Sequence, residues 1–440
     1  DSLIKDVISL YPSDEGSLLR DLEQVTRSVT SRGIEIFTIS LPEICSDLEY
    51  SLEIGWYKRR YCGPLSKLRG FIPSLFYTLY TKVFSEAGVI LEEPDHDAIR
   101  QLRTLLRVFK KLNIACSPER LEISYGNFKS IEEQLPAPSL SWGSRDLSCG
   151  SSWPSLSDLV QRNLRRDSIR SRLSEIDRNW SESDLLCCAS LAQRVSDSIV
   201  SKFLFDRSSK PKHGPGAVSE KFSNSKFEFP TWNHRLEKFF PFCDYGLINY
   251  SYLGEEVNEQ DFRSDPPAKL IDVPKDAKGP RLIASEPISN QFIQQLIMKD
   301  LRKNVARSPL RHAIDFRSQI PSRNLALKAS YPDSGLSTID LSSASDRLSC
   351  SVVECIFRCK FLYLEILNAA RTPTILMPDG SILHSKKFAA QGAAFTFPVQ
   401  SIVYSLLCAG TLMFQHPRRY SDLFRSHRVF GDDIIVPQSS

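Results

Sequence analysis

The sequence predicts an α+β protein in which a small antiparallel sheet is flanked by helices. Residues 429–437 place the adjacent carboxylates Asp432 and Asp433 after a glycine, between two apolar and β-branched runs. A glycine-containing turn between such runs is typical of a tight β-hairpin. A second extended run ends at Asp340, and helical patterns occupy much of the chain between these two places. Because Gly-Asp is also an ordinary hairpin turn, the residues upstream decide between a metal site and a simple turn.

Composition sets broad limits on the class of protein. The chain has 440 residues, of which 41% are hydrophobic and 25% charged, as in globular proteins. Its length exceeds what one core supports, so we expect two or three domains. A net charge of +4 neither requires nor excludes a nucleic-acid partner. None of the 11 cysteines forms a Cys-x-x-Cys motif, so reduced thiols in a cytosolic protein are the simplest interpretation.

The chain gives no sign of a membrane protein at this level. It opens without a secretory signal, and we expect no apolar run to reach the length of a membrane span. The most apolar stretch, residues 71–91, is interrupted by Pro73, Lys82 and Glu86. We therefore expect no membrane association. The first residue is an aspartate rather than a methionine, and only seven residues follow Asp433, so we expect a fragment of a longer reading frame.

Two basic clusters precede the acidic residues. The first contains five arginines within eleven positions: Arg162, Arg165, Arg166, Arg170 and Arg172. It fits either a phosphate-contacting surface or a solvated helix face, and the second interpretation is preferred. The second cluster ends in the run Lys212-His213-Gly214-Pro215-Gly216. There a glycine-rich loop lets backbone approach a phosphate that the cations attract, although an ordinary turn fits equally well.

A cationic hairpin follows. Lys275, Lys278 and Arg281 recur at every third position across a turn between two extended runs, residues 270–274 and 282–284. Cations presented in this way could bind a triphosphate, and an arginine can bind two of its oxygens at once. The alternative is a charged surface hairpin.

The extended run that ends at Asp340 is the main upstream partner of the hairpin. In a strand, Ile339 and Leu341 face one side while Asp340 faces the other. We expect Asp340 to be buried and to need a partner, for which Asp432 and Asp433 are candidates. The alternative is a simple loop cap. Residues 345–367 show a helical pattern, with Ser345 as its expected N-cap.

A loop of small residues around Gly392 lies between these acids. It leads through Thr396 into a helix with Pro398 in its first turn. Such a loop allows close approach of backbone to a nucleotide, and its alternative is mere loop flexibility.

In this order, the elements resemble the palm of viral RNA-dependent RNA polymerases and, more narrowly, the replicases of positive-strand RNA bacteriophages, the leviviruses. The resemblance covers roughly residues 200–440, and the two metal-binding positions lie 92 residues apart. The segments that carry it are His213-Gly214-Pro215-Gly216, Val273-Pro274-Lys275 with Arg281 and Glu286-Pro287, residues 340–346, Gly392 with Thr396-Phe397, and Gly431-Asp432-Asp433.

The resemblance implies a nucleotidyl-transfer mechanism with two metal ions. Asp340, Asp432 and Asp433 would be catalytic and would hold two Mg²⁺ ions, with Mn²⁺ as a substitute. The positive charges that offset the incoming triphosphate would belong to Lys275, Lys278 and Arg281.

Other positions would contact nucleotide and template. The resemblance implies that Ser345 or Asp346 senses the ribose 2′-hydroxyl, and that Gly392 and Thr396 lie near the templating pair. Asp346 lies six positions after Asp340, whereas in many other RNA viruses the corresponding acid lies five positions on. Both Ser345 and Asp346 therefore stay candidates for recognition of the ribose. The chain also has Gln400 where many viruses have Asn. The template-binding residues would be Lys212, His213, Gly214 and Gly216.

The resemblance also implies the architecture and the partners. We expect a right-hand polymerase with residues 1–200 as an N-terminal helical region associated with the fingers, 201–335 as fingers and 336–440 as palm, the thumb being largely absent. The expected partners are RNA template and product, ribonucleoside triphosphates and, by family, host elongation factors Tu and Ts and ribosomal protein S1, in the cytoplasm of a bacterial host. Alternatives are a reverse transcriptase or other two-metal polymerase, or a non-catalytic RNA-binding remnant.

Overall fold

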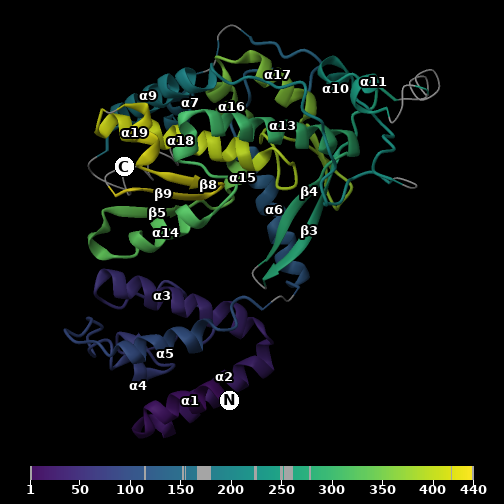
Figure 1. Cartoon of the computed structure of the whole chain (residues 1–440). Coiled ribbons are helices and arrows are strands. Elements are labelled where there is room, and N and C mark those ends of the chain that lie inside the picture. The colour runs from purple at the N-terminus through teal and green to yellow at the C-terminus, as the bar shows by residue number, and fades with distance from the viewer. Residues whose placement is uncertain are drawn as a thin grey trace. The chain divides into compact units, whose positions relative to one another are not determined.

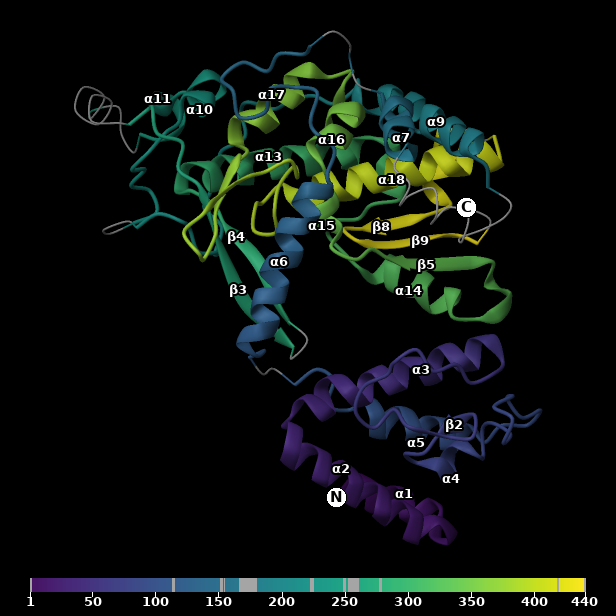
Figure 2. The same ribbon diagram turned by 180° about the vertical axis from the view of Figure 1, so that it is seen from behind.

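The computed structural model describes residues 2–112, 115–150, 153, 155–165, 180–221, 225–247, 251, 261–276, 279–417 and 419–438. The chain divides into two compact units, the first formed by Asp1–Gly126 and Asp272–Arg281, and the second by Asn127–Ile271 and Leu282–Ser440. Figures 1 and 2 show the elements from opposite sides. The boundaries predicted at residues 200 and 335 separate parts of the chain by their expected roles, whereas these two units are separated by compactness. The predicted boundaries stay predictions.

The first unit is mainly helical and has its own core. Leu18, Leu48, Leu79, Phe84 and Leu102 are fully buried in it. Its elements are α1 (Ser2–Leu10), η1 (Pro12–Asp14), α2 (Glu15–Arg32), the π-helix η2 (Ile36–Ser40), α3 (Leu41–Ile54), β1 (Leu68–Arg69), β2 (Ile72–Pro73), α4 (Tyr77–Tyr80) and α5 (His96–Arg107). The boundary between the units falls within α6 (Pro118–Gln134), β3 (Ala268–Asp276) and β4 (Gly279–Ser285).

The second unit is built on two long helices in close contact, α9 (Glu182–Val200) and α18 (Thr396–Gln415). A Cβ atom added at Gly410 would lie 2.4 Å from the Cβ of Ala192, so only glycine permits this approach. The remaining helices of the unit are α7 (Leu156–Leu164), α10 (His234–Phe239), α11 (Phe242–Tyr245), α13 (Ile288–Arg307), η4 (Pro309–His312), α14 (Ile320–Ala329), η5 (Pro332–Ser334), α15 (Ala344–Arg347), α16 (Cys350–Phe357), α17 (Phe361–Ala370) and α19 (Tyr420–Arg425).

The acidic residues lie on a three-stranded antiparallel sheet with the order β5-β9-β8. Its strands are β5 (Leu336–Asp340), β8 (Arg428–Phe430) and β9 (Asp433–Pro437). Figures 1 and 2 both show α18 between α9 and this sheet, with α14 beside β5. The predicted α+β class, with an antiparallel sheet flanked by helices, is confirmed.

A second sheet has the order β4-β3-β6-β7. It adds the short strands β6 (Thr374–Leu376) and β7 (Ile382–His384), which pair with each other in antiparallel register. Strand β3 pairs with β6 in parallel, with Ala268 opposite Ile375. The predicted hairpin around residues 270–284 is therefore present as β3 and β4.

The predicted single helix over residues 345–367 is wrong, because the structure divides this stretch into α15, α16 and α17. After α15 the backbone is extended at Leu348, whose carbonyl accepts a hydrogen bond from the Phe388 N–H. The Cys350 N–H in turn donates to the Lys386 carbonyl. Ser349 rather than Ser345 caps the following helix, since its hydroxyl accepts from the Val352 N–H. Pairing with residues 386–388 therefore interrupts the helix after Arg347.

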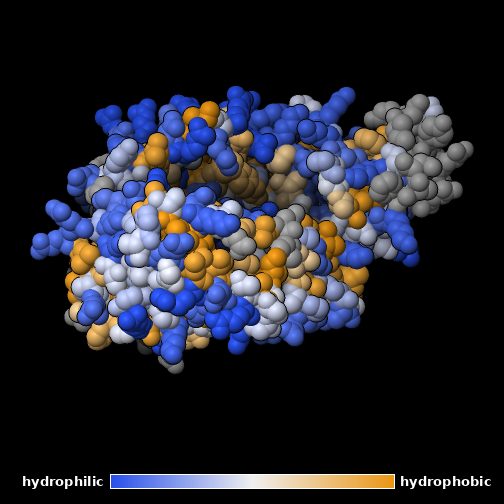
Figure 3. Space-filling view, turned by 90° about the horizontal axis from the view of Figure 1, so that it is seen from below, coloured by the Kyte–Doolittle hydropathy of each residue, from blue (hydrophilic) through white to orange (hydrophobic). Residues whose placement is uncertain are grey.

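Helix α18 corrects another expectation, that no apolar run reaches the length of a membrane span. By length and composition this helix could cross a membrane, but 61% of its most apolar 18-residue segment is buried inside the protein. Such burial is typical of a core helix. Apolar side chains also reach the surface elsewhere: Figure 3 shows a largely hydrophilic face with hydrophobic patches, and Phe71 is 66% exposed.

Candidate active site

The turn that carries the two adjacent aspartates is held against the start of α18. Gly431 has a φ of +69°, and a Cβ atom there would lie 2.6 Å from the ring of Phe397. The Gly431 N–H donates a hydrogen bond to Ser401 Oγ at 3.0 Å. The rings of Phe397 and Phe430 meet edge to face with centroids 4.8 Å apart. Glycine is thus required both for the backbone conformation and for the close contact.

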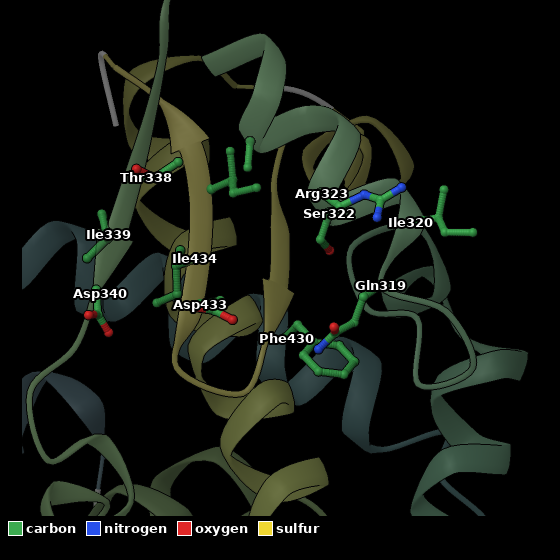
Figure 4. A pocket seen from close by; sticks show the side chains of 12 residues that line it. Gln319, Ile320, Ser322, Arg323, Thr338, Ile339, Asp340, Phe430, Asp433 and Ile434 are labelled. Atoms are coloured by element: carbon green, nitrogen blue, oxygen red, sulfur yellow. The ribbon is translucent and has the colours of Figure 1, made fainter. Parts of the chain in front are cut away.

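The register of the sheet brings the third acid to the same place. Asp340 at the end of β5 is the direct cross-strand partner of Asp433 at the start of β9, and Phe430 pairs with Asp433 on its other side. Asp432 occupies the turn itself. In Figure 4 the side chains of Asp340 and Asp433 lie on neighbouring strands. The structure therefore unites the three predicted catalytic residues at one end of one sheet.

The electrostatics of these acids agree with their proximity. The pKa of Asp433 is raised above its ordinary value by partial burial and by the negative charges of Asp432 and Asp340. Burial and the charge of Asp432 raise the pKa of Tyr404 to about 12, and the Tyr404 hydroxyl donates to the Ala344 carbonyl. Like charges this close favour the arrival of a cation.

Burial is not what brings Asp340 to its partners, contrary to the prediction. Asp340 is exposed, and Ile339 beside it is 41% exposed, because β5 is the edge strand of its sheet. Strand register provides the pairing instead. Within the described residues, no three His, Cys, Asp or Glu side chains are grouped closely enough to hold a metal ion as they stand.

A cavity of about 570 Å³ opens beside Asp340 and Asp433. Figure 4 shows it between the sheet and α14, with Gln319 and Arg323 on the α14 side. Its volume lies in the range of sites that bind small molecules, roughly 300–1,000 Å³. Neither Gln319 nor Arg323 was singled out from the sequence, because Gln319 directly precedes a short helix and Arg323 occupies an ordinary position within it.

The two candidates for ribose recognition have different surroundings. Ser345 is buried, and its hydroxyl has no hydrogen-bond partner among the described residues. The carboxylate of Asp346 keeps 22% exposure and accepts a hydrogen bond from Lys387 Nζ at 3.1 Å. Only Asp346 therefore has a charged group that is both held in place and open to solvent.

Sequence reasoning missed Lys387, whose side chain is fully buried. Its ammonium group lies 3.4 Å from the ring centroid of Phe128 and 3.6 Å from Glu132 Oε2, in addition to its contact with Asp346. The other oxygen of Glu132 accepts the N–H groups of Lys386 and Lys387. A buried ammonium needs such partners, but they lie 41 and 255 positions away, beyond any local pattern.

The loop around Gly392 is pinned rather than flexible. Gly392 has a φ of +118°, and a Cβ atom there would lie 2.0 Å from the Ala284 carbonyl oxygen. The Ala284 N–H donates to the Gln391 carbonyl at 2.7 Å. Thr396 is buried, and its hydroxyl donates to the Ala390 carbonyl at 3.0 Å. Both residues shape the loop, and their predicted nucleotide contacts stay predictions.

The predicted template loop is packed in part against aromatic rings. His213 lies against Phe227, Phe229 and Phe292, and burial followed by the nearby charge of Lys226 lowers its pKa to about 4. The ring is therefore neutral at pH 7. The carbonyls of the two neighbouring glycines, Gly214 and Gly216, both accept hydrogen bonds from Lys226. The template contacts predicted for Lys212, His213, Gly214 and Gly216 stay predictions.

The predicted triphosphate ligands belong to a different unit from the acids. Lys275 and Arg281 are exposed in the first unit, and Lys278 lies outside the described residues. Of the arginine cluster, Arg166, Arg170 and Arg172 also lie outside them. The roles predicted for these cations stay predictions.

Comparison with known proteins gives a consistent family. The family described as RNA replicase, beta-chain matches residues 181–440. The RNA-directed RNA polymerase subunit beta of Escherichia virus Qbeta is 33% identical over 171 residues, which is 38% of this chain and 27% of that protein. The corresponding beta chain of Enterobacteria phage GA is 31% identical over 191 residues, which is 43% of this chain and 33% of that protein. The matched region thus spans about a third or less of these relatives.

One solved structure that matches is that of a viral enzyme. The insertion-loop deletion mutant of the RNA-dependent RNA polymerase of a human picobirnavirus gives a TM-score of 0.34 at 9% identity, covering 72% of this chain and 60% of the other. A TM-score of this size does not by itself establish a shared fold.

The first prediction concerns Lys387. Replacing it by methionine keeps the packing on Phe128 but leaves Glu132 and Asp346 without their cation, so the free energy of unfolding should fall by about 3 kcal/mol or more. Urea unfolding measures this loss. The matched control is Lys386→Met, whose ammonium group forms, within the described part of the chain, one hydrogen bond, to the Glu133 carbonyl at 3.5 Å. Equal stabilities of the two variants would contradict a structural role for the buried ammonium.

The second prediction concerns Gly392. Gly392→Ala should lower the free energy of unfolding by at least about 3 kcal/mol, because the added methyl group meets the Ala284 carbonyl and the φ angle disfavours alanine. Gly380→Ala is the control, since Gly380 has a φ of +81° but open space around its Cβ position. Thermal unfolding should show a clearly smaller loss for the control. A loss of the same size in both variants would mean that the close approach to β4 does not exist.

Proposed function

We propose that this chain, which belongs to the RNA replicase beta-chain family, carries the nucleotidyl-transfer site of an RNA-directed RNA polymerase. That polymerase would replicate a phage RNA genome. The observation that supports the proposal most strongly is the pairing of Asp340 with Asp433 beside Asp432. The α+β class and the acidic antiparallel hairpin are those expected for the palm of a right-hand viral polymerase. Together they suit transfer of a nucleotide to a growing RNA strand.

The donor set fits divalent magnesium. Carboxylate oxygens are ligands that Mg²⁺ prefers, and Mg²⁺ commonly binds one or two carboxylates together with substrate phosphates. Asp340, Asp432 and Asp433 would hold two such ions, with Mn²⁺ as a substitute, after small rotations of exposed side chains. When bound, the metal activates the 3′-hydroxyl and neutralises triphosphate charge. Partial burial and the negative charges of Asp432 and Asp340 raise the pKa of Asp433, and a bound cation would relieve the repulsion among the three carboxylates.

The chain's own residues would position the nucleotide. Asp346, oriented by Lys387, can accept a hydrogen bond from a ribose 2′-hydroxyl, a group that deoxyribose lacks. Burial of the Ser345 hydroxyl makes that residue the weaker candidate. Lys275, Lys278 and Arg281 remain the proposed ligands of the triphosphate, with Gly392 and Thr396 proposed near the templating pair.

The proposed partners follow from the family. They are RNA template and product, ribonucleoside triphosphates and, in the cytoplasm of a bacterial host, elongation factors Tu and Ts and ribosomal protein S1. A reverse transcriptase or another two-metal polymerase is the alternative, and the choice of sugar separates it from the proposal.

The third prediction tests the catalytic assignment. Asp432→Asn should lower ribonucleotide incorporation by on the order of 100-fold or more, because a negative charge that holds the cation is lost. Primer extension on an RNA template measures incorporation, both with this chain and with a chain extended to the length of its relatives. The control is Asp333→Asn, an exposed carboxylate of the same unit. Undiminished extension by Asp432→Asn would show that the assignment is wrong.

The fourth prediction tests sugar selection. Asp346→Asn should reduce the preference for ribonucleotides over deoxyribonucleotides by roughly 10- to 100-fold, the worth of a hydrogen bond to a charged group. Ser345→Ala should leave that preference unchanged. The ratio of kcat/KM values for the two sugars is the readout. The opposite pattern, with selection lost only in Ser345→Ala, would assign the role to the serine.

A further inference from the structure

Half of the residues that line a second cavity in the same unit, of about 920 Å³, are lysines or arginines. It is formed by the second half of α13, by η4 and the residues after it, and by a short segment that includes Lys212. Its cationic residues are Lys210, Lys212, Lys299, Arg302, Lys303, Arg307, Arg311 and Arg317. Asp315 is its one acidic lining residue within the described part of the chain. A chain with a net charge of only +4 thus concentrates positive charge at one place.

These cations are largely uncompensated. Within the described residues, Lys303 is the one member of the set that forms an ion pair, with Asp206 at 2.7 Å. The exposed residues Lys299, Arg302, Arg307 and Arg311 present their charges to the cavity without a carboxylate partner in the described chain. Like charges gathered in this way repel one another, so a bound polyanion would stabilise the site.

The charges are spread along a line rather than gathered around a point. Lys299, Arg302, Lys303 and Arg307 occupy one face of α13, at spacings of three, one and four residues. From Lys299 to Arg307 the helix rises by about 12 Å. A row of this length suits successive phosphates of a strand better than one phosphate group, because a groove that tracks a nucleic-acid backbone needs repeated contacts.

An aromatic residue connects this cavity to the acidic hairpin. Phe316 lines the cavity, and its ring lies 5.6 Å from the Arg302 guanidinium. Phe316 also meets Phe397, with centroids 5.8 Å apart, and Phe397 packs on Phe430 next to the aspartate turn. Residues 315–317 line the cationic cavity, and Gln319 and Ile320 line the cavity of Asp340 and Asp433. The two cavities therefore share one short segment as a wall.

We infer that the cationic cavity binds the sugar-phosphate backbone of a single RNA strand whose path leads to the aspartate hairpin. The inference rests on the proposed function and adds a binding site to it. The row of cations would contact phosphates, and Phe316 with Arg302 would offer a stacking surface to a base.

The test replaces three exposed cations of the cavity. The variant Arg302→Gln/Arg307→Gln/Arg311→Gln is compared with Arg27→Gln/Arg32→Gln/Arg194→Gln, which removes the same charge from exposed residues outside the cavity. Fluorescence anisotropy follows binding of a labelled single-stranded RNA of about 12 nucleotides between roughly 50 and 200 mM salt. Thermal unfolding checks that both variants fold like the wild type.

The expected result is a change in salt dependence. Each lost phosphate contact lowers the slope of log K against log salt by about 0.7 for a single strand, so the cavity variant should lose about 2 and the control almost nothing. An unchanged slope in the cavity variant, or an equal loss in the control, would overturn the inference. So would displacement of the RNA by ATP or polyglutamate at equal concentration of charge, because the site would then favour a free triphosphate or an acidic peptide.

The same assay separates this inference from the proposed function. Asp432→Asn should bind RNA with the wild-type slope, because Asp432 does not line the cationic cavity. Absence of nucleotide incorporation together with cavity-dependent RNA binding would refute the proposed function and leave the inference standing. Nucleotide incorporation together with RNA binding that is unchanged in the cavity variant would support the proposed function and overturn the inference.

Discussion

The attachment of the aspartate turn to α18 is the contact on which the site depends. The Gly431 N–H is held by Ser401, and the ring of Phe397 occupies the space that any side chain at Gly431 would need. With the turn fixed, β9 can pair with β5 in one register, which sets Asp340 opposite Asp433. A slip of one residue would turn every side chain of the strand to the opposite face. The proposed chemistry therefore depends on a hydrogen bond and an aromatic contact that touch no substrate.

A second constraint comes from buried cations around residues 385–388. The Arg371 guanidinium is fully buried and donates to the carbonyls of Ser385, Lys387 and Phe388, while the Lys387 ammonium lies between Glu132 and Asp346. These contacts hold an irregular segment against the broken helix that follows β5. Such a segment is expensive to bury unless its polar groups are satisfied. Through Lys387 the segment also contacts Asp346, six residues after Asp340.

Local patterns predicted the hairpin, the strand that ends at Asp340 and the helix that contains Pro398, because apolar spacing and turn residues reveal these elements within a few positions. The break after Arg347 escaped prediction, since its cause is backbone pairing with residues 386–388, which are far away in the sequence. Lys387 escaped for the same reason. The exposure of Asp340 follows from the edge position of β5, which depends on strand order and cannot be read from one strand. The cationic cavity joins residues from 210 to 317 and becomes visible only in three dimensions.

The pairing of β5 with β9 implies that Asp340 and the aspartate turn share one cation site. Electron paramagnetic resonance of Mn²⁺ titrated into the wild-type chain and into Asp340→Asn and Asp432→Asn tests it most directly, because free and bound Mn²⁺ give different spectra. Wild type should bind the ion, and both substitutions should weaken binding by a similar, large factor. Binding that survives loss of Asp340 while disappearing with Asp432 would show that the hairpin holds the ion alone and that Asp340 is no part of the site.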